Sequence, residues 1–158
     1  MNRTVVSKLY KEISEVLLNE GAINVIPPLK KTSNKRVYGY LKCKICKNTV
    51  TNWVESTDYV GIYINHSCVC NYRDEYLNAD YTEYKKLYHE FSELVDTICH
   101  EFAHMKFRRH DRNHRALTEY YIGLYAEWAK GKYFIEGTKY KGYAFRMDLF
   151  MKDVKDHK

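Results

Sequence analysis

Two histidines and a glutamate in one short segment are the residues best suited to chemistry. The segment His100-Glu101-Phe102-Ala103-His104 places the histidines four residues apart. On an α-helix this spacing projects both imidazoles from adjacent turns of one face, so both can bind one metal ion. Coordination positions remain for a third protein ligand and a water, as in a catalytic zinc site, and Glu101 is placed to act as the general base. The spacing therefore predicts a zinc-dependent hydrolytic site.

The third metal ligand is expected in the segment that follows, which contains His110, Asp111 and His114. His110 comes six residues after His104. That distance lets the chain leave the helix, turn and bring an imidazole back to the metal, so we predict His110 as the third ligand. His114 is the alternative, or a group that faces the substrate or supports a ligand. Asp111 is suited either to orient a ligand imidazole or to cap the next helix.

Three helices are predicted from apolar residues that recur at helical spacing. Their ranges are 4–19, which ends before Gly21, 80–106, which contains the histidine motif, and 113–130, which ends before Gly131. In the 80–106 helix the apolar stripe through Leu94, Ile98 and Phe102 falls on a different face from the histidines. The packing face and the metal face are therefore separable. The C-terminal segment 133–158 is rich in Tyr, Phe and Lys and carries no clear pattern.

Residues typical of β-strands dominate between positions 36 and 72, where we predict a small, mainly antiparallel sheet. The strand candidates are Val37–Cys43, Thr49–Trp53 and Tyr59–Asn65, separated by Lys-Asn and Glu-Ser-Thr-Asp turns. The segment Ile23–Asn34 contains both prolines of the chain and is expected to be an extended connector or loop. Together these elements predict one α+β domain over residues 1–158, with the sheet packed on the helix that carries the histidines.

Four cysteines offer a second metal site. Cys43 and Cys46 form a C-x-x-C pair, and Cys68 and Cys70 form a C-x-C pair. Four thiolates are enough for a structural zinc that joins the ends of the sheet. A C-x-C pair is less usual as a ligand pair, because it places alternate side chains on one face of a strand. A structural zinc and reduced cysteines packed in the sheet both stay open, and Cys99 is expected in the core.

Composition restricts the compartment and the partners. Residues 1–20 contain no continuous apolar stretch, so we expect no signal peptide, no transmembrane segment, no membrane partner and an intracellular, cytoplasmic location. Five cysteines, an odd number, also fit a reducing compartment. The net charge of +6 permits contact with nucleic acid, but it is spread along the chain and is typical of a solvated surface.

The stretch His100–Asp111 resembles the active-site segment of small zincin-type metallopeptidases, most of all the SprT-like, WLM and YgjP-like group. In these families a sheet precedes an H-E-x-x-H helix, and a third histidine follows after a short connector. The resemblance is specific over roughly a dozen residues and only architectural elsewhere. It implies a zincin-like fold, Zn²⁺ held by His100, His104 and His110, and Glu101 as the general base.

Two departures accompany the resemblance. The glycine that metzincins place between the second and third histidines is absent, with Phe107 in its position. This argues against a true metzincin. The aromatic position often seen shortly after the third histidine is occupied by His114, which leaves the choice of ligand open.

The resemblance also implies how a substrate is held. In zincins the edge strand before the active-site helix aligns the substrate backbone by strand addition, and Tyr59–Asn65 is the matching segment here. A tyrosine or histidine often stabilises the oxyanion of the tetrahedral intermediate, and the candidates are Tyr120, Tyr121 and His114.

Three functions from different classes are consistent with these patterns. The leading prediction is a zinc metallopeptidase that hydrolyses peptide bonds in a protein or peptide substrate. The alternative is a zincin-fold binding or adaptor module for nucleic acid or a partner protein, with a structural or vestigial metal site. Hydrolysis of a phosphodiester is disfavoured, because such sites are usually rich in carboxylates and hold more than one metal ion.

Overall fold

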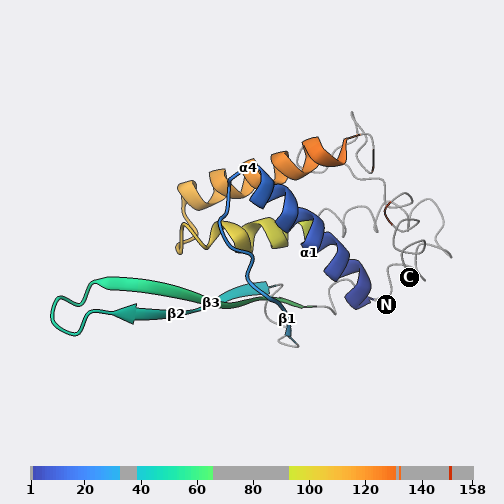
Figure 1. Cartoon of the computed structure of the whole chain (residues 1–158). Coiled ribbons are helices and arrows are strands. Elements are labelled where there is room, and N and C mark those ends of the chain that lie inside the picture. Colours follow the sequence, from blue (N-terminus) through green and yellow to red (C-terminus); the bar gives the residue numbers. More distant parts are fainter. Residues whose placement is uncertain (1, 33–38, 66–92, 131, 133–149, 151–158) are drawn as a thin grey trace.

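The computed structural model describes residues 2–32, 39–65, 93–130, 132 and 150 (Figure 1). The elements in chain order are α1 (Asn2–Asn19), β1 (Leu29–Thr32), β2 (Gly39–Lys47), β3 (Val54–Asn65), a helix over residues 93–103, and α4 (Arg112–Ala129). The fold is α+β, as predicted. The described residues form three helices and a mixed sheet, and Figure 1 shows these helices gathered on one side of the sheet. Within the described residues, no helix is both long and apolar enough to span a bilayer.

The sheet has the strand order β1-β3-β2, so β3 is central and β2 is an edge strand. β2 pairs with β3 in the antiparallel sense and β1 pairs with β3 in the parallel sense, with Leu29 opposite Ile62. The prediction of a connector or loop over Ile23–Asn34 was wrong at β1, which lies within it. The Ile62 backbone N–H donates to the Pro28 carbonyl at 2.9 Å, so this segment is held by a strand far along the chain. Sequence spacing alone does not reveal such long-range pairing.

The prediction of an edge strand at Tyr59–Asn65 was also wrong. This segment lies in the central strand β3, and Ile62, Tyr63 and Ile64 pair with β1 as well as β2.

The segment Thr49–Trp53 forms the hairpin connection rather than the predicted strand. The Asn48 Oδ1 atom accepts hydrogen bonds from the backbone N–H groups of Val50 at 2.8 Å and Thr51 at 2.9 Å. Asn52 has a φ of 59°, a left-handed conformation that asparagine tolerates better than most residues. These local bonds favour a turn over strand pairing. The predicted Glu-Ser-Thr-Asp turn is instead part of β3.

The core lies between the helices and the inner face of the sheet. The apolar stripe predicted for the motif helix is confirmed, because Leu94, Ile98 and Phe102 are all buried. The Phe102 ring stacks on the Tyr10 ring of α1, with their centroids 5.4 Å apart. Cys99 is buried as a free thiol, also as predicted. The other elements contribute Leu9, Ile13 and Leu17 from α1, Ile62 and Ile64 from β3, and Tyr121, Ile122 and Tyr125 from α4.

Several predicted features lie outside the described residues. They are the part of the 80–106 helix before residue 93, the pair Cys68 and Cys70, and almost all of the segment 133–158. Where the helices are described, α1 begins two residues before the predicted 4–19 range, α4 begins one residue before the predicted 113–130 range, and the motif helix ends at residue 103 instead of 106.

Phe102→Ala should destabilise the protein by about 3–5 kcal/mol, because it removes a fully buried ring and leaves a cavity beside Tyr10. Urea unfolding followed by circular dichroism measures this change. Tyr120→Ala is the matched control, since Tyr120 is 59% exposed and its loss should cost less than about 0.5 kcal/mol. Equal losses in the two variants would contradict the packing described here.

Candidate metal centre

His104 lies where the motif helix ends. Its backbone N–H still donates to the His100 carbonyl at 3.2 Å, so the two residues remain one turn apart. The next two hydrogen bonds join residues three positions apart instead of four. Met105 N–H donates to the Phe102 carbonyl and Lys106 N–H donates to the Ala103 carbonyl, both at 3.1 Å. Such three-residue steps tighten the end of a helix. They end the helix at residue 103 and turn the chain.

The segment after the helix fixes the His104 ring. Its Nδ1 atom lies 2.9 Å from the Phe107 carbonyl oxygen. A carbonyl oxygen can only accept a hydrogen bond, so Nδ1 carries the proton and Nε2 of the neutral ring keeps its lone pair. Metal-binding histidines are commonly held in this way. The backbone of Phe107 thus prepares His104 to bind a cation.

Three imidazole nitrogens come together next to this turn. The Nε2 atom of His100 lies 3.1 Å from that of His104 and 3.0 Å from that of His110, and the His104–His110 distance is 2.9 Å. A tetrahedral zinc site with bonds of about 2.05 Å to nitrogen has nitrogen–nitrogen edges of about 3.3 Å. The observed triangle is close to one face of such a site.

Hydrogen bonds among the rings cannot satisfy all three nitrogens. Each neutral imidazole has one N–H group, and His104 uses its own on the Phe107 carbonyl. Protonating Nε2 of both His100 and His110 makes these two donors face each other. Protonating only one leaves two lone pairs facing each other across another edge. A cation shared by the three lone pairs removes this conflict.

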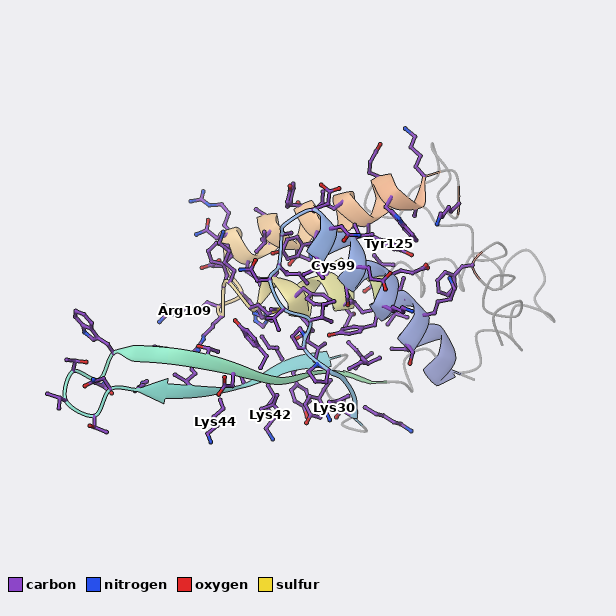
Figure 2. The ribbon with its side chains drawn as sticks, in the orientation of Figure 1. Lys30, Lys42, Lys44, Cys99, Arg109 and Tyr125 are labelled. Atoms are coloured by element: carbon purple, nitrogen blue, oxygen red, sulfur yellow. The ribbon has the colours of Figure 1, made fainter. Side chains whose placement is uncertain are left out.

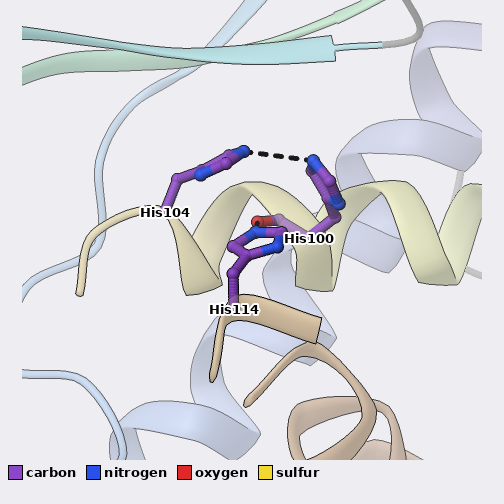
Figure 3. Close-up of side chains that lie close together, drawn as sticks. All are labelled: His100, His104 and His114. Carbon is purple, nitrogen blue, oxygen red and sulfur yellow. Dashed lines mark hydrogen bonds between the residues drawn. The ribbon is translucent and has the colours of Figure 1, made fainter. Parts of the chain in front are cut away.

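His114 also lies in this cluster. Figure 3 shows it below His100 and His104, and the potential ligand atoms of these three histidines all lie within 4.8 Å of one another. They are therefore close enough to bind a metal ion. This grouping competes with the triangle that includes His110. The ligand atoms of this grouping lie within a limit of 4.8 Å, whereas the triangle with His110 has edges of 2.9–3.1 Å, and the shorter edges suit a four-coordinate site better.

The contacts of His114 indicate a supporting position. Its Nε2 atom lies 3.0 Å from the His100 carbonyl oxygen, and its ring stacks on that of His104 with centroids 4.1 Å apart. The residue is 2% exposed, and the Thr118 hydroxyl donates to its carbonyl. His114 therefore holds the turn of the helix from which both other histidines project.

Asp111 is the N-cap of α4. Its Oδ1 atom accepts a hydrogen bond from the His114 N–H at 2.9 Å, in the extended backbone conformation typical of a cap. Of the two roles expected for Asp111, the described contacts therefore show the cap. Because α4 begins two residues after His110, the cap also fixes where the chain bearing His110 enters the helix.

The electrostatics of the cluster favour neutral imidazoles. Burial lowers the pKa of His100 to about 4, with further lowering by the neighbouring histidines His114, His104 and His110. Burial also lowers the pKa of His104, against the raising effect of the Phe107 carbonyl. Both rings are therefore neutral at pH 7, which is the form that binds metal ions.

Glu101 is buried beside the cluster, with 3% of its surface exposed. Burial raises its pKa to about 7, and a hydrogen bond from the Leu41 backbone of β2 opposes the rise. Its Oε1 atom lies 3.8 Å from Nε2 of His100, and its buried Oε2 atom has no hydrogen-bond partner among the described residues. A buried carboxylate oxygen without a partner is costly and points to a bound group that completes it.

A pocket of about 780 Å³ opens over the cluster. Its floor is formed by Glu101 and the histidines at 100, 104 and 110. Its walls are formed by the edge strand β2, the facing part of β3 and the turn after the motif helix, with the lining residues Gly39, Tyr40, Leu41, Cys43, Thr57, Tyr59, Met105 and Arg108. Tyr59 joins two of these walls, since its hydroxyl donates to the Met105 carbonyl at 3.2 Å. The histidine cluster is thus reached through a groove beside β2, which among the described residues pairs with β3 alone.

The pocket includes residues that the sequence did not single out. Leu41 and Thr57 reach it through strand register, for which the sequence carries no local signal. Arg108 did have a local signal in the sequence, because it lies between His104 and His110.

Other predicted site residues lie elsewhere. The Tyr121 hydroxyl donates to the Ala22 carbonyl at 3.3 Å, Tyr120 is exposed on α4, and neither lines the pocket. Of the cysteines predicted for a second zinc, Cys43 is half-buried and lines the pocket. The side chain of Cys46, together with Cys68 and Cys70, falls outside the described part of the chain.

Comparisons with known proteins identified no relative of this chain. A scan against protein-family models, a search of curated proteins and a search of solved structures each found no match. The resemblance to zincin-type peptidases therefore rests on His100–Asp111, and function has to be argued from the site.

In metal-free protein, Glu101→Gln should be more stable than wild type at about pH 8, by roughly 3 kcal/mol. The Glu101 pKa is raised from 4.5 to about 7, so the cost of its charged form is absent below pH 4.5, builds up to pH 7 and is complete above it. The histidines titrate alike in both proteins, so their contribution to stability drops out of the difference between wild type and Glu101→Gln. Urea unfolding with a chelator at several pH values measures the gap, and a gap independent of pH would contradict the burial of this carboxylate.

Proposed function

We propose that this protein is a zinc-dependent metallopeptidase, with His100, His104 and His110 as metal ligands and Glu101 as the general base. The observation that carries the proposal is the triangle of three Nε2 atoms, 2.9–3.1 Å apart, beside a buried carboxylate oxygen without a partner. The hydrogen bonds of the described residues satisfy neither feature. A metal ion and a water account for both.

The donor set favours zinc. Three neutral imidazoles in a tetrahedral face suit Zn²⁺, whereas Mg²⁺ and Ca²⁺ take mainly oxygen ligands. Three protein ligands also leave one position open, as catalytic zinc sites require. When bound, zinc supplies a Lewis acid that polarises a carbonyl and lowers the pKa of water.

Glu101 then has a defined task. A carboxylate with a pKa near 7 is well matched to accept a proton from the attacking water and to return it to the leaving amine at neutral pH. The Leu41 N–H and the surrounding apolar side chains hold the carboxylate in place. Stacking of Phe102, its neighbour in sequence, on Tyr10 fixes the helix on which it stands.

The edge of β2 is suited to bind a peptide backbone. In the described part of the chain β2 pairs with β3 on one side only, and its residues Gly39–Leu41 line the pocket. An extended peptide that adds to this edge would pass directly over the metal cluster. This assignment moves the substrate strand from the expected Tyr59–Asn65 to β2. It also favours a peptide over a phosphodiester, since strand addition recognises backbone amides.

The oxyanion donor is also assigned to a different residue. Arg108 lines the pocket and carries N–H donors, whereas Tyr120 and Tyr121 do not reach it. Donors directed at developing negative charge are among the larger contributions to catalysis. Arg108 replaces the two tyrosines in the proposal.

The test compares wild type with Glu101→Gln, each loaded with one zinc, on a mixture of unfolded proteins analysed by mass spectrometry. Wild type should cut peptide bonds. Glu101→Gln should keep its zinc and lose activity by about 10²–10⁴-fold, the usual contribution of a general base. Glu127→Gln is the matched control, because Glu127 is exposed on α4 and should leave activity unchanged.

Zinc-loaded wild type that cuts no protein or peptide, itself included, would overturn the proposal. Equal activity of wild type and Glu101→Gln would do the same, and would favour a binding or adaptor module with a structural metal.

A further inference from the structure

The sheet face opposite the helices carries tyrosines and lysines. Side chains alternate along a strand, so Tyr40, Lys42 and Lys44 of β2 share one face. Figure 2 shows Lys30, Lys42 and Lys44 pointing away from the helices. Register places Lys30 beside Tyr63 and Tyr40 opposite Tyr63, so both tyrosines belong to this outer face. The apolar residues between them point inward to the core.

Two of the lysines converge on one backbone position. A Cβ atom at Gly61 would lie 2.7 Å from Lys30 Cγ and 2.9 Å from the Pro28 carbonyl oxygen, so only glycine leaves room for the Lys30 stem to cross β3. Gly61 is the register partner of Lys42. Both ammonium groups are thus brought toward the same part of the sheet. Neither forms an ion pair with another described residue.

The tyrosines form a flat aromatic platform beside these lysines. The Tyr40 and Tyr63 rings stack with centroids 4.6 Å apart and planes inclined by 6°. Tyr40 is 37% exposed. A pair of parallel rings on an open sheet presents a π-face on which a further flat ring can stack.

We propose that this outer face, defined by Lys30, Tyr40, Lys42 and Tyr63, binds single-stranded nucleic acid. Aromatic rings that stack bases, next to cations that meet the phosphates, are the two features by which proteins hold single strands. Lys30 and Lys42, which form no ion pair with another described residue, and the net charge of +6 supply the charge complementarity. Asp58 is the register partner of Lys44, so the phosphates meet Lys30 and Lys42 first.

A single strand fits better than a duplex or an acidic protein. The bases of a duplex are stacked on one another and do not offer their faces to Tyr40. An acidic peptide would use the lysines but gain little from the aromatic pair. The inference does not require peptidase activity, because Lys30, Lys42 and Tyr63 do not line the pocket over the metal cluster, and of the four residues only Tyr40 also lines it.

The test measures binding of the full chain to a fluorescent oligothymidylate by anisotropy at several salt concentrations. Lys42→Glu should weaken binding strongly and reduce the slope of log affinity against log salt by about 0.7. Lys11→Glu makes the same charge change at an exposed site on α1 and should have little effect. Tyr40→Leu should weaken binding by roughly tenfold without changing the slope, whereas Tyr40→Phe keeps the ring and should bind like wild type.

Equal effects of Lys42→Glu and Lys11→Glu would overturn the inference, because binding would then depend on net charge alone. The inference would also be overturned if a duplex or polyglutamate bound as tightly as the single strand. The same holds if Tyr40→Leu left the affinity for the oligothymidylate unchanged. Thermal unfolding of each variant identifies any that fail to fold, and the comparison of Tyr40→Phe with Tyr40→Leu then carries the test.

Discussion

The candidate site depends on three ring nitrogens being held closer together than their lone pairs favour. The Nε2 atoms of His100, His104 and His110 lie within 3.1 Å of one another, although hydrogen bonds can satisfy only part of the set. Their repulsion is opposed by the packing of the motif helix and by the His104 contact with the Phe107 carbonyl. A bound cation converts this cost into stabilisation, so folding and metal binding are expected to be coupled.

Much of this arrangement follows from local sequence. The spacing of Leu94, Ile98 and Phe102 indicated the buried face of the helix, and the spacing of the histidines indicated the metal face. The sheet was harder to predict, because β1 depends on pairing with residues 62–65, about 30 positions away. The edge position of β2, and with it the wall of the pocket, is a consequence of that long-range pairing. Contacts made through backbone carbonyls, such as that of Phe107, leave no trace in residue identity.

The sheet separates two chemically different faces. On the inner side, burial keeps His100 and His104 neutral and raises the pKa of Glu101, which suits a water-activating metal site. On the outer side, Lys30 and Lys42 are exposed beside a stacked tyrosine pair. β2 contributes to both, since alternate residues along one strand face opposite sides. A single short hairpin can therefore serve a pocket and a binding surface.

The most direct test of the account is the zinc content of purified protein, measured by mass spectrometry for wild type, His110→Ala and His114→Ala. The account predicts about one tightly held zinc per chain in wild type, its loss in His110→Ala, and its retention in His114→Ala, whose ring supports the helix. Any zinc that remains in His110→Ala would indicate a second zinc site at the cysteines. Absence of zinc from wild type after incubation with the metal, or its loss only in His114→Ala, would contradict the central claim.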